Sequence, residues 1–248
     1  MNISASKILI TGGGKGIGNF IALSLLDIAE KVFVLENNEK LLNNLPKHAK
    51  LISYQCDITQ PETVENVIKS IFDTHGGINV CINNAGIIHS EPLVNILAAK
   101  DKKHSIRNWE NVININLNAV FYISANVAEN MIKRKEKGVI VNISSISAQG
   151  NIGQSAYAAS KAAVEALSKT WSKELGMYKI RCVAIAPGFF DTPSTKASLS
   201  EHMLSKWQNA VPIGRLGKLE ELFSAIKFVI ENDYFNGKTL SLDGGLTI

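Results

Sequence analysis

Short apolar stretches alternate with longer amphipathic stretches along most of the chain. Seven of the short stretches have the length and the valine and isoleucine content of buried strands. They cover residues 7–11, 31–35, 51–56, 79–82, 139–143, 180–185 and 238–242. Helical patterns lie between them, over residues 19–29, 61–74, 109–135, 154–176 and 220–230. The alternation predicts an α/β fold in which a parallel sheet is covered by helices on both faces.

A glycine-rich stretch, Thr-Gly-Gly-Gly-Lys-Gly-Ile-Gly at residues 11–18, separates the first predicted strand from the first helix. Such glycines let backbone N–H groups approach a pyrophosphate, and the helix N-terminus favours its negative charge. Tight-turn chemistry alone could explain the glycines, but the order of strand, glycines and helix favours nucleotide binding. We therefore predict a Rossmann-type, doubly wound sheet. No internal repeat or low-complexity linker occurs, so we expect residues 1–248 to form one dinucleotide-binding and catalytic domain.

Two residues bear on the choice of coenzyme. Glu36 follows the second strand about twenty residues after the glycines, where a carboxylate can bind both hydroxyls of the adenosine ribose. It would repel the 2′-phosphate of NADP(H), whereas Lys15 could attract that phosphate. The Lys15 side chain is long, flexible and solvated, which weakens its attraction, and no basic residue follows Glu36 at Asn37 or Asn38. We expect NAD(H) to be preferred, with NADP(H) as the alternative.

Tyr157 and Lys161 stand four residues apart at the start of an alanine-rich helical pattern. On a helix they share one face, where the ammonium would favour the phenolate and lower the pKa of the tyrosine. Such a tyrosine can give or take a proton. A surface tyrosine and lysine would be the simpler interpretation of this motif alone. Tyr234 and Lys238 have the same spacing but enclose a turn sequence, Asn-Gly, and we interpret that copy as chance.

Further polar residues lie at two strand ends and inside one helix. Residues 83–86, Asn-Asn-Ala-Gly, suit a loop that bonds to neighbouring strands while passing under a cofactor. Asn116 lies among apolar residues of the helix at 109–135, so its amide must be hydrogen-bonded, as a structural contact or as part of a proton path. Ser144 and Ser145 end the fifth strand.

The order and spacing of these motifs resemble the short-chain dehydrogenase/reductase family over essentially the whole chain. The set comprises Thr11-Gly12-x-x-x-Gly16-x-Gly18, Asn83-Asn84-Ala85-Gly86, Asn116, Ser145, Tyr157-x-x-x-Lys161 and Pro187-Gly188. Residues 153–157 and 213–217 look most like the 3-oxoacyl-[acyl-carrier-protein] reductase group. The resemblance implies an NAD(P)-dependent oxidoreductase that interconverts a ketone and a secondary alcohol, with a 3-oxoacyl thioester as one candidate substrate. A small polyol, a sugar or a steroid is the alternative.

The resemblance also implies roles for individual residues. Tyr157 would be the general acid in reduction and the base in oxidation, and Lys161 would lower its pKa and hold the nicotinamide ribose. Ser145 would bind the substrate oxygen, and Asn116 would hold a water that links Lys161 to solvent. The residues that would bind the coenzyme are Gly12, Gly14, Lys15, Gly16, Ile17, Gly18, Glu36, Asp57, Ile58, Asn84, Ala85, Gly86, Tyr157, Lys161, Pro187, Gly188 and Thr192. Those that would contact the substrate are Ser145, Tyr157, His89, Gln149 and Phe189, under a lid at 189–212.

The chain departs from the family pattern in two places. Ser145 lies twelve residues before Tyr157, where much of the family has thirteen. Ser144 would restore thirteen, but successive residues of a strand face opposite ways, and the strand end at residues 142–145 aligns without a shift. We therefore prefer Ser145. The segment 93–108 is longer than is common in the family and would alter access to the site.

Composition and charge exclude several other classes of function. Hydrophobic residues make up 46% of the chain, which is typical of a soluble globular protein, and no apolar run is long enough for a membrane span. The net charge of +4 is mild, so we expect no nucleic-acid partner. Three separated cysteines predict buried thiols in a reducing, cytoplasmic compartment. The five histidines lack ligand spacing, so we expect no metal.

The helices at 109–135 and 154–176 carry apolar or small residues around more than one face. A monomer would leave these faces exposed, so we expect a homotetramer, or at least a dimer. The main alternative to an enzyme is a protein of the same fold that senses dinucleotide without catalysis. The complete set of Asn116, Ser145, Tyr157 and Lys161 argues against that alternative.

Overall fold

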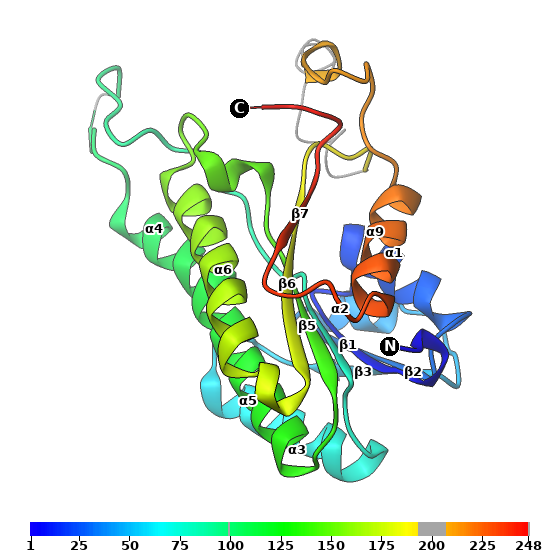
Figure 1. Cartoon of the computed structure of the whole chain (residues 1–248). Helices are drawn as coiled ribbons and strands as arrows, with labels where there is room; N and C mark the ends of the chain where they lie inside the picture. The colour runs from blue at the N-terminus through cyan, green and yellow to red at the C-terminus, as the bar shows by residue number, and fades with distance from the viewer. Residues whose placement is uncertain (99, 193–206, 248) are drawn as a thin grey trace.

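The computed structural model describes residues 1–98, 100–192 and 207–247. Seven parallel strands form one sheet in the order β3-β2-β1-β4-β5-β6-β7 (Figure 1). They are β1 (Lys7–Thr11), β2 (Lys31–Glu36), β3 (Leu51–Gln55), β4 (Val80–Asn83), β5 (Gly138–Ile143), β6 (Ile180–Pro187) and β7 (Thr239–Leu242). Every predicted strand is present to within two residues at either end. The predicted α/β, doubly wound, Rossmann-type sheet is therefore confirmed.

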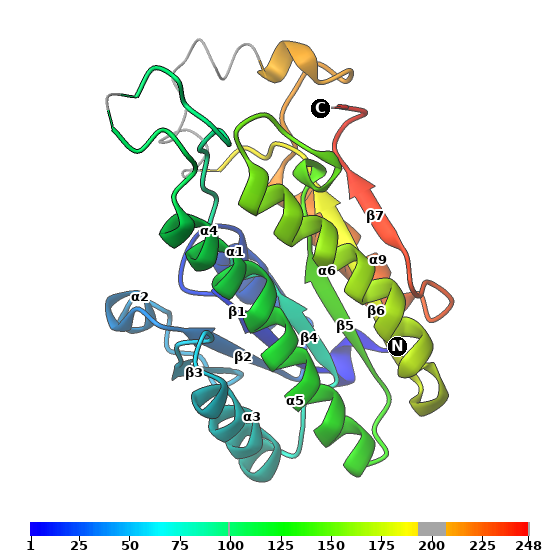
Figure 2. The same ribbon diagram turned by 90° about the vertical axis from the view of Figure 1, so that its left-hand side faces the viewer.

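Helices cover both faces of the sheet (Figures 1 and 2). One face carries α1 (Gly16–Leu26) and α9 (Leu219–Glu231), and the other carries α3 (Pro61–His75), α5 (Ala119–Lys133) and α6 (Ser155–Glu174). Two shorter helices are α2 (Glu39–Asn43) and α4 (Ile106–Ile113). Each described helix is too short or too polar to cross a lipid bilayer. The three cysteines are buried free thiols, as predicted.

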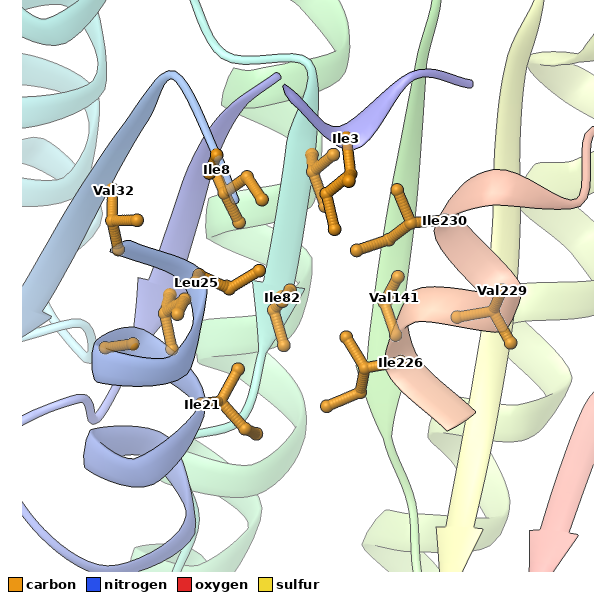
Figure 3. Packing of buried hydrophobic residues seen from close by; sticks show 14 of the residues in the cluster. Ile3, Ile8, Ile21, Leu25, Val32, Ile82, Val141, Ile226, Val229 and Ile230 are labelled. Atoms are coloured by element: carbon orange, nitrogen blue, oxygen red, sulfur yellow. The ribbon is translucent and has the colours of Figure 1, made fainter. Parts of the chain in front are cut away.

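Side chains of the central strands alternate between two hydrophobic cores. Ile8 and Ile10 of β1 face α1 and α9, whereas Leu9 faces α3 and α5. Figure 3 shows the first of these cores, where Ile21 of α1 and Ile226 of α9 lie over the same strands. All five side chains are completely buried. A shift of β1 by one residue would exchange its two faces, so this burial holds the strands in register and their ends at fixed places.

The strand order reverses between β1 and β4. The chain runs from β1 outward to β2 and β3, then returns to place β4 on the other side of β1. Ligands of such sheets bind in the crevice at this reversal, outside the carboxyl ends of the strands. Gly12 follows β1 and Asn84 follows β4, so the fold brings the glycine-rich stretch and the loop at 83–86 together at this crevice.

Three helical parts of the structure differ from the predictions. The first helix, α1, spans Gly16–Leu26 instead of residues 19–29. The predicted helix at 109–135 begins earlier, at Ile106, because the Ser105 side chain caps it by accepting a hydrogen bond from the Asn108 backbone (3.3 Å). It also contains a π-helical turn, Asn114–Asn118, between α4 and α5. The short helix α2 was not predicted. It buries none of its side chains, so it leaves no hydrophobic periodicity in the sequence.

Candidate active site

The glycine-rich stretch forms a turn that other backbone approaches closely. Gly12 and Gly16 have φ angles of 66° and 58°, a region that side chains disfavour. A Cβ atom on Gly12 would lie 3.0 Å from the Cα of Ala85, and one on Gly18 would overlap the Gly12 carbonyl and the Asn84 amide. Glycine is therefore required at positions 12 and 18 to bring α1 and the loop at 83–86 against the turn.

Asn84 and Thr11 hold this loop in place. The Thr11 hydroxyl accepts hydrogen bonds from the backbone N–H groups of Asn84 (3.1 Å) and Ala85 (3.0 Å). The Asn84 amide donates in return to the carbonyl oxygens of Thr11 (3.1 Å) and Gly12 (3.3 Å). The amides of the loop thus join β1 to β4, as the sequence led us to expect, and fix Ala85 beside the turn.

Glu36 lies at the end of β2 with its carboxylate against the glycine-rich turn. One oxygen, Oε2, accepts a hydrogen bond from Gly14 N (3.2 Å). The other, Oε1, accepts from the backbone of Asn37 (3.1 Å) and Asn38 (3.2 Å). Lys15 is exposed. The acid that could bind a ribose is therefore held by three backbone groups, whereas the base that could bind a phosphate is free to move in solvent.

The remaining predicted coenzyme residues lie at the same edge of the sheet. Asp57 and Ile58 follow β3, and the Asp57 carboxylate accepts two hydrogen bonds from Thr59 (3.0 and 2.7 Å). Gly188 follows β6, and its N–H donates to the carbonyl of Leu242 at the end of β7 (2.9 Å). Pro187 and Thr192 are buried, and Ile17 is half-buried at the start of α1.

Tyr157, Lys161 and Ser145 come together next to this edge. Tyr157 and Lys161 lie on the buried face of α6 and are 8% and 5% exposed. The Lys161 ammonium lies 5.7 Å from the centre of the Tyr157 ring and donates to the carbonyl of Ile143 (2.7 Å). Ser145 follows β5, and its side chain lies close enough to Tyr157 to lower the pKa of the phenol. A Cβ on Gly86 would lie 3.5 Å from Lys161 Nζ, which connects the group to the loop at 83–86.

The two neighbouring serines point to different partners. The Ser144 hydroxyl donates to the carboxylate of Glu165 (2.7 Å) and to the carbonyl of Lys161 (3.2 Å), and it is buried. Ser145 faces Tyr157 instead and accepts a hydrogen bond from Ser147 N (3.1 Å). Of these two serines, Ser145 is therefore the one that lies next to Tyr157.

Asn116 lies in the π-helical turn and is completely buried. Its side chain makes two hydrogen bonds with the Ile87 backbone, accepting from N and donating to O (both 2.9 Å). It also donates to the Ser160 hydroxyl (3.4 Å), which in turn donates to the carbonyl of Tyr157 (2.7 Å). Ser160, which stands between Tyr157 and Lys161, was not predicted as a site residue because no motif marks it. Asn116 thus connects the segment after β4 to the helix of Tyr157.

Burial decides the protonation of Tyr157 and Lys161. It raises the pKa of Tyr157, and the Ser145 side chain offsets this only in part. It also lowers the pKa of Lys161 to about 8. We expected the Lys161 charge to lower the pKa of Tyr157, and the direction is opposite because removal from water disfavours both charged forms. Tyr157 is therefore protonated at neutral pH, the form that can donate a proton.

The predicted substrate residues lie around the opening of the site. Phe189 stacks on Trp207 with ring centres 4.5 Å apart, while Gln149 is exposed. The His89 ring is hydrogen-bonded to Glu91 (2.9 Å). An open hollow of about 420 Å³ beside these residues is lined by Gly150, Asn151, Ile152, Trp207, Ala210, Leu246 and Thr247. Of the predicted lid at 189–212, residues 193–206 lie outside the described residues.

Comparisons with known proteins identify the family of the chain. The family model for short chain dehydrogenases matches residues 6–202. A 3-oxoacyl-[acyl-carrier-protein] reductase of Thermotoga maritima is 36% identical over all of both chains. A sorbitol-6-phosphate 2-dehydrogenase of Klebsiella pneumoniae is 33% identical over 100% of this chain and 98% of its own.

The chain also superposes on solved structures over almost its whole length. The aldohexose dehydrogenase of Thermoplasma acidophilum superposes with a TM-score of 0.84 at 32% identity, covering 98% of this chain and 94% of its own. A short-chain dehydrogenase/reductase of Mycobacterium marinum superposes with a TM-score of 0.88 at 26% identity, covering 98% and 96%. The chain therefore belongs to the short-chain dehydrogenase/reductase family of NAD(P)-dependent oxidoreductases that act on CH–OH groups.

Proposed function

We propose that this chain interconverts a ketone and a secondary alcohol, with Tyr157 as the acid and base of the reaction. The observation that carries the proposal is the meeting of Tyr157, Ser145 and Lys161 beside the glycine-rich turn. The turn fits a dinucleotide because Gly16, at the start of α1, is exposed with open space around it, next to the fixed Glu36 carboxylate. A bound nicotinamide would supply or accept the hydride.

In the reducing direction, the protonated Tyr157 would donate its proton to the carbonyl oxygen of the substrate. Ser145 would donate a hydrogen bond to the same oxygen as negative charge develops on it. Lys161, whose pKa is about 8, would favour the resulting phenolate and help return a proton to it. Asn116 would hold the route for that proton, since its amide lies between the Ile87 backbone and the helix of Tyr157.

The leading candidate substrate is a 3-oxoacyl thioester. The support is the full-length similarity to 3-oxoacyl-[acyl-carrier-protein] reductases, together with a mostly apolar hollow beside Trp207 and Ile152, near the opening of the site. The second candidate is a sugar or polyol, because relatives of similar identity are a sorbitol-6-phosphate 2-dehydrogenase and an aldohexose dehydrogenase.

NAD(H) is the proposed coenzyme, and Glu36 is the reason. A 2′-phosphate at the ribose would carry nearly two negative charges beside the carboxylate. At about 4 Å, unit charges repel by about 4 kcal/mol at an effective dielectric near 20. Three backbone hydrogen bonds hold Glu36 in place, so it would not move aside at little cost, while Lys15 is exposed and its charge is screened.

We propose a homotetramer, or at least a dimer, because large apolar side chains are exposed on α4 and α5. Ile106, Trp109 and Phe121 are 74%, 40% and 51% exposed along α4 and α5, and exposed apolar side chains along a helix face are typical of an interface. Light scattering at micromolar concentration tests this, and a mass near the 27.0 kDa of one chain would contradict it. A cytoplasmic location stays a prediction.

The test of function is turnover with defined substrates. The protein is incubated with NADH and a panel that holds a 3-oxoacyl thioester, ketoses and steroid ketones, and separately with NAD⁺ and an aldohexose or a polyol. Absorbance follows the loss of NADH in the first assay and its formation in the second. We expect oxidation of NADH with the thioester, and less than about a tenth of that rate with Tyr157→Phe. Turnover only with a sugar would support the second candidate. Dinucleotide binding without turnover on any substrate would instead indicate the non-catalytic sensor.

A further inference from the structure

His89, Glu91 and His104 form a cluster beside the start of α6, outside the proposed proton path. Each offers one ligand atom, and these atoms all lie within 4.8 Å of one another. We propose that the three side chains form a Zn²⁺ site, which fastens the long segment between β4 and α4 next to the active site. The sequence led us to expect no metal, because fifteen residues separate the two histidines.

A reversal of the chain brings the two histidines together. Val94 and Lys103 form an antiparallel bridge, and His104 N donates to the carbonyl of Leu93 (2.9 Å). This places His104 against Glu91, and the rings of His89 and His104 meet edge to face with centres 5.9 Å apart. The ligand set is thus produced by a hairpin-like turn, which spacing along the chain does not reveal.

A hydrogen bond to the backbone decides which ring nitrogen of His104 carries the proton. Its Nδ1 lies 3.0 Å from the carbonyl oxygen of Glu91, and because a carbonyl only accepts, Nδ1 must carry the proton. In the neutral ring Nε2 is then a bare lone pair. The side chain is only 8% exposed, and Nε2 is buried with no hydrogen-bonding partner among the described residues. Histidine ligands of zinc are typically oriented by such a bond from the second nitrogen.

The Nε2 of His104 lies near a carboxylate oxygen. It lies 3.9 Å from Glu91 Oε2, which is too far for a hydrogen bond but within the reach of two zinc bonds of about 2.0–2.1 Å. His89 Nε2 lies 2.9 Å from the same oxygen. Ligand atoms of a tetrahedral zinc are about 3.3 Å apart at these bond lengths, so both separations need only small side-chain rotations. On binding, zinc would displace the proton that lies between His89 and Glu91, and this proton would leave to solvent.

Neighbouring groups orient the carboxylate of Glu91. Ser105 N donates to Oε1 (3.0 Å), and the Asn108 amide donates to Oε2 (3.1 Å). Trp109 lies edge to face against His104, with ring centres 6.4 Å apart. Two imidazole nitrogens and one carboxylate favour zinc over magnesium or calcium, which take oxygen ligands. His89 is 32% exposed, which leaves room for water at the fourth position.

The site would couple the long segment to the catalytic helix. Glu91 N donates to the carbonyl of Gly153 (2.6 Å), and the Gln154 amide donates to the Ser90 hydroxyl (3.3 Å). Ser155 then begins α6, two residues before Tyr157. Figure 2 shows the segment above α4, close to the start of α6. A metal at Glu91 therefore holds both the segment and the loop that leads to Tyr157.

The test is zinc binding by the full chain. Protein stripped with a chelator is titrated with ZnCl₂ by calorimetry, and bound zinc is measured by mass spectrometry after dialysis. We expect one zinc per chain, and slower trypsin cleavage at Lys100, Lys102 and Lys103 with zinc than without. His104→Ala should weaken binding at least about 10-fold, since loss of groups that only support a zinc ligand already costs about 10–100-fold.

Two further variants keep the test decisive. His89→Ala should weaken zinc binding as His104→Ala does. Because the His89 side chain is half-exposed, its removal opens no buried cavity. Circular dichroism checks that both variants are folded. His48→Ala removes an exposed histidine outside the cluster and should bind zinc like the unchanged protein. The proposal is overturned if the unchanged protein binds no zinc, if binding survives in both cluster variants, or if His48→Ala loses it equally.

Discussion

Replacing Lys161 with methionine should stabilise the protein at neutral pH while removing a group of the proposed site. Lys161 is buried, and its pKa falls from 10.5 to about 8. At 1.36 kcal/mol per pKa unit, the charged ammonium lowers the free energy of unfolding by about 3 kcal/mol below pH 8. Methionine avoids this cost but loses the hydrogen bond to Ile143 O, worth about 1–2 kcal/mol. We expect a net gain of about 1–2 kcal/mol at pH 7.

The pH dependence separates the two contributions. In a lysine whose folded pKa is lowered, the unfolded chain holds more protons between the two pKa values, so stability rises with pH from about 8 to 10.5. The advantage of Lys161→Met over the unchanged protein should therefore shrink by about 2–3 kcal/mol between pH 7 and pH 10. The lost hydrogen bond counts equally at both pH values and cancels in this difference.

Urea unfolding of both proteins at pH 7 and pH 10, at one protein concentration, measures the effect. Lys69→Met is the matched control, because Lys69 is exposed on α3 and its replacement should change the two free energies of unfolding equally. An advantage of Lys161→Met that is as large at pH 10 as at pH 7 would show that burial does not lower the pKa of Lys161, and the reasoning would fail.

Three predictions concern the reaction itself. Tyr157→Phe should leave dinucleotide binding intact, which a fluorescence titration with NADH checks. It should reduce turnover to below about a tenth of the unchanged rate, because proton transfer is typically worth about 10²–10⁴-fold. Ser145→Ala should lower kcat at least about tenfold, and Ser144→Ala, whose hydroxyl is bound to Glu165, much less; the reverse order would mean that Ser144 contacts the substrate. With one substrate, kcat/KM should be higher for NADH than for NADPH. A preference for NADPH above about tenfold, or about 1.4 kcal/mol, would show that attraction of the 2′-phosphate by Lys15 outweighs its repulsion by Glu36.

The centre of the sheet could be predicted from the sequence because its central strands are buried on both faces. Stretches such as β5 and β6, with every residue buried, must be apolar throughout, and glycine or proline bounds them. The start of α1 was placed too late, at Asn19, because the glycines read as a loop. Gly16 is already the first helical residue, with its positive φ, since a glycine can leave the turn and enter the helix directly.

The candidate site was only partly visible in the sequence. Tyr157, Lys161 and Ser145 could be found because motif spacing on a helix and a strand end fixes which residues share a face. The predicted direction of the pKa shift of Tyr157 was wrong. The spacing indicates that Lys161 lies beside Tyr157, but it does not show how deeply Tyr157 is buried. His104 and Glu91 were missed as partners because an irregular loop, whose path no periodicity records, brings them together.

The π-helical turn at Asn114–Asn118 has a consequence for the length of the chain. A π-turn holds one more residue than an α-turn, and successive residues of an α-helix are rotated by about 100°. Deleting one residue here would restore a regular α-helix and turn Asn116 away from Ile87, or turn Val120 and Ile123 of α5 out of their buried positions. Relatives of this chain should therefore tolerate insertions and deletions in the loops on either side far more readily than within this single turn.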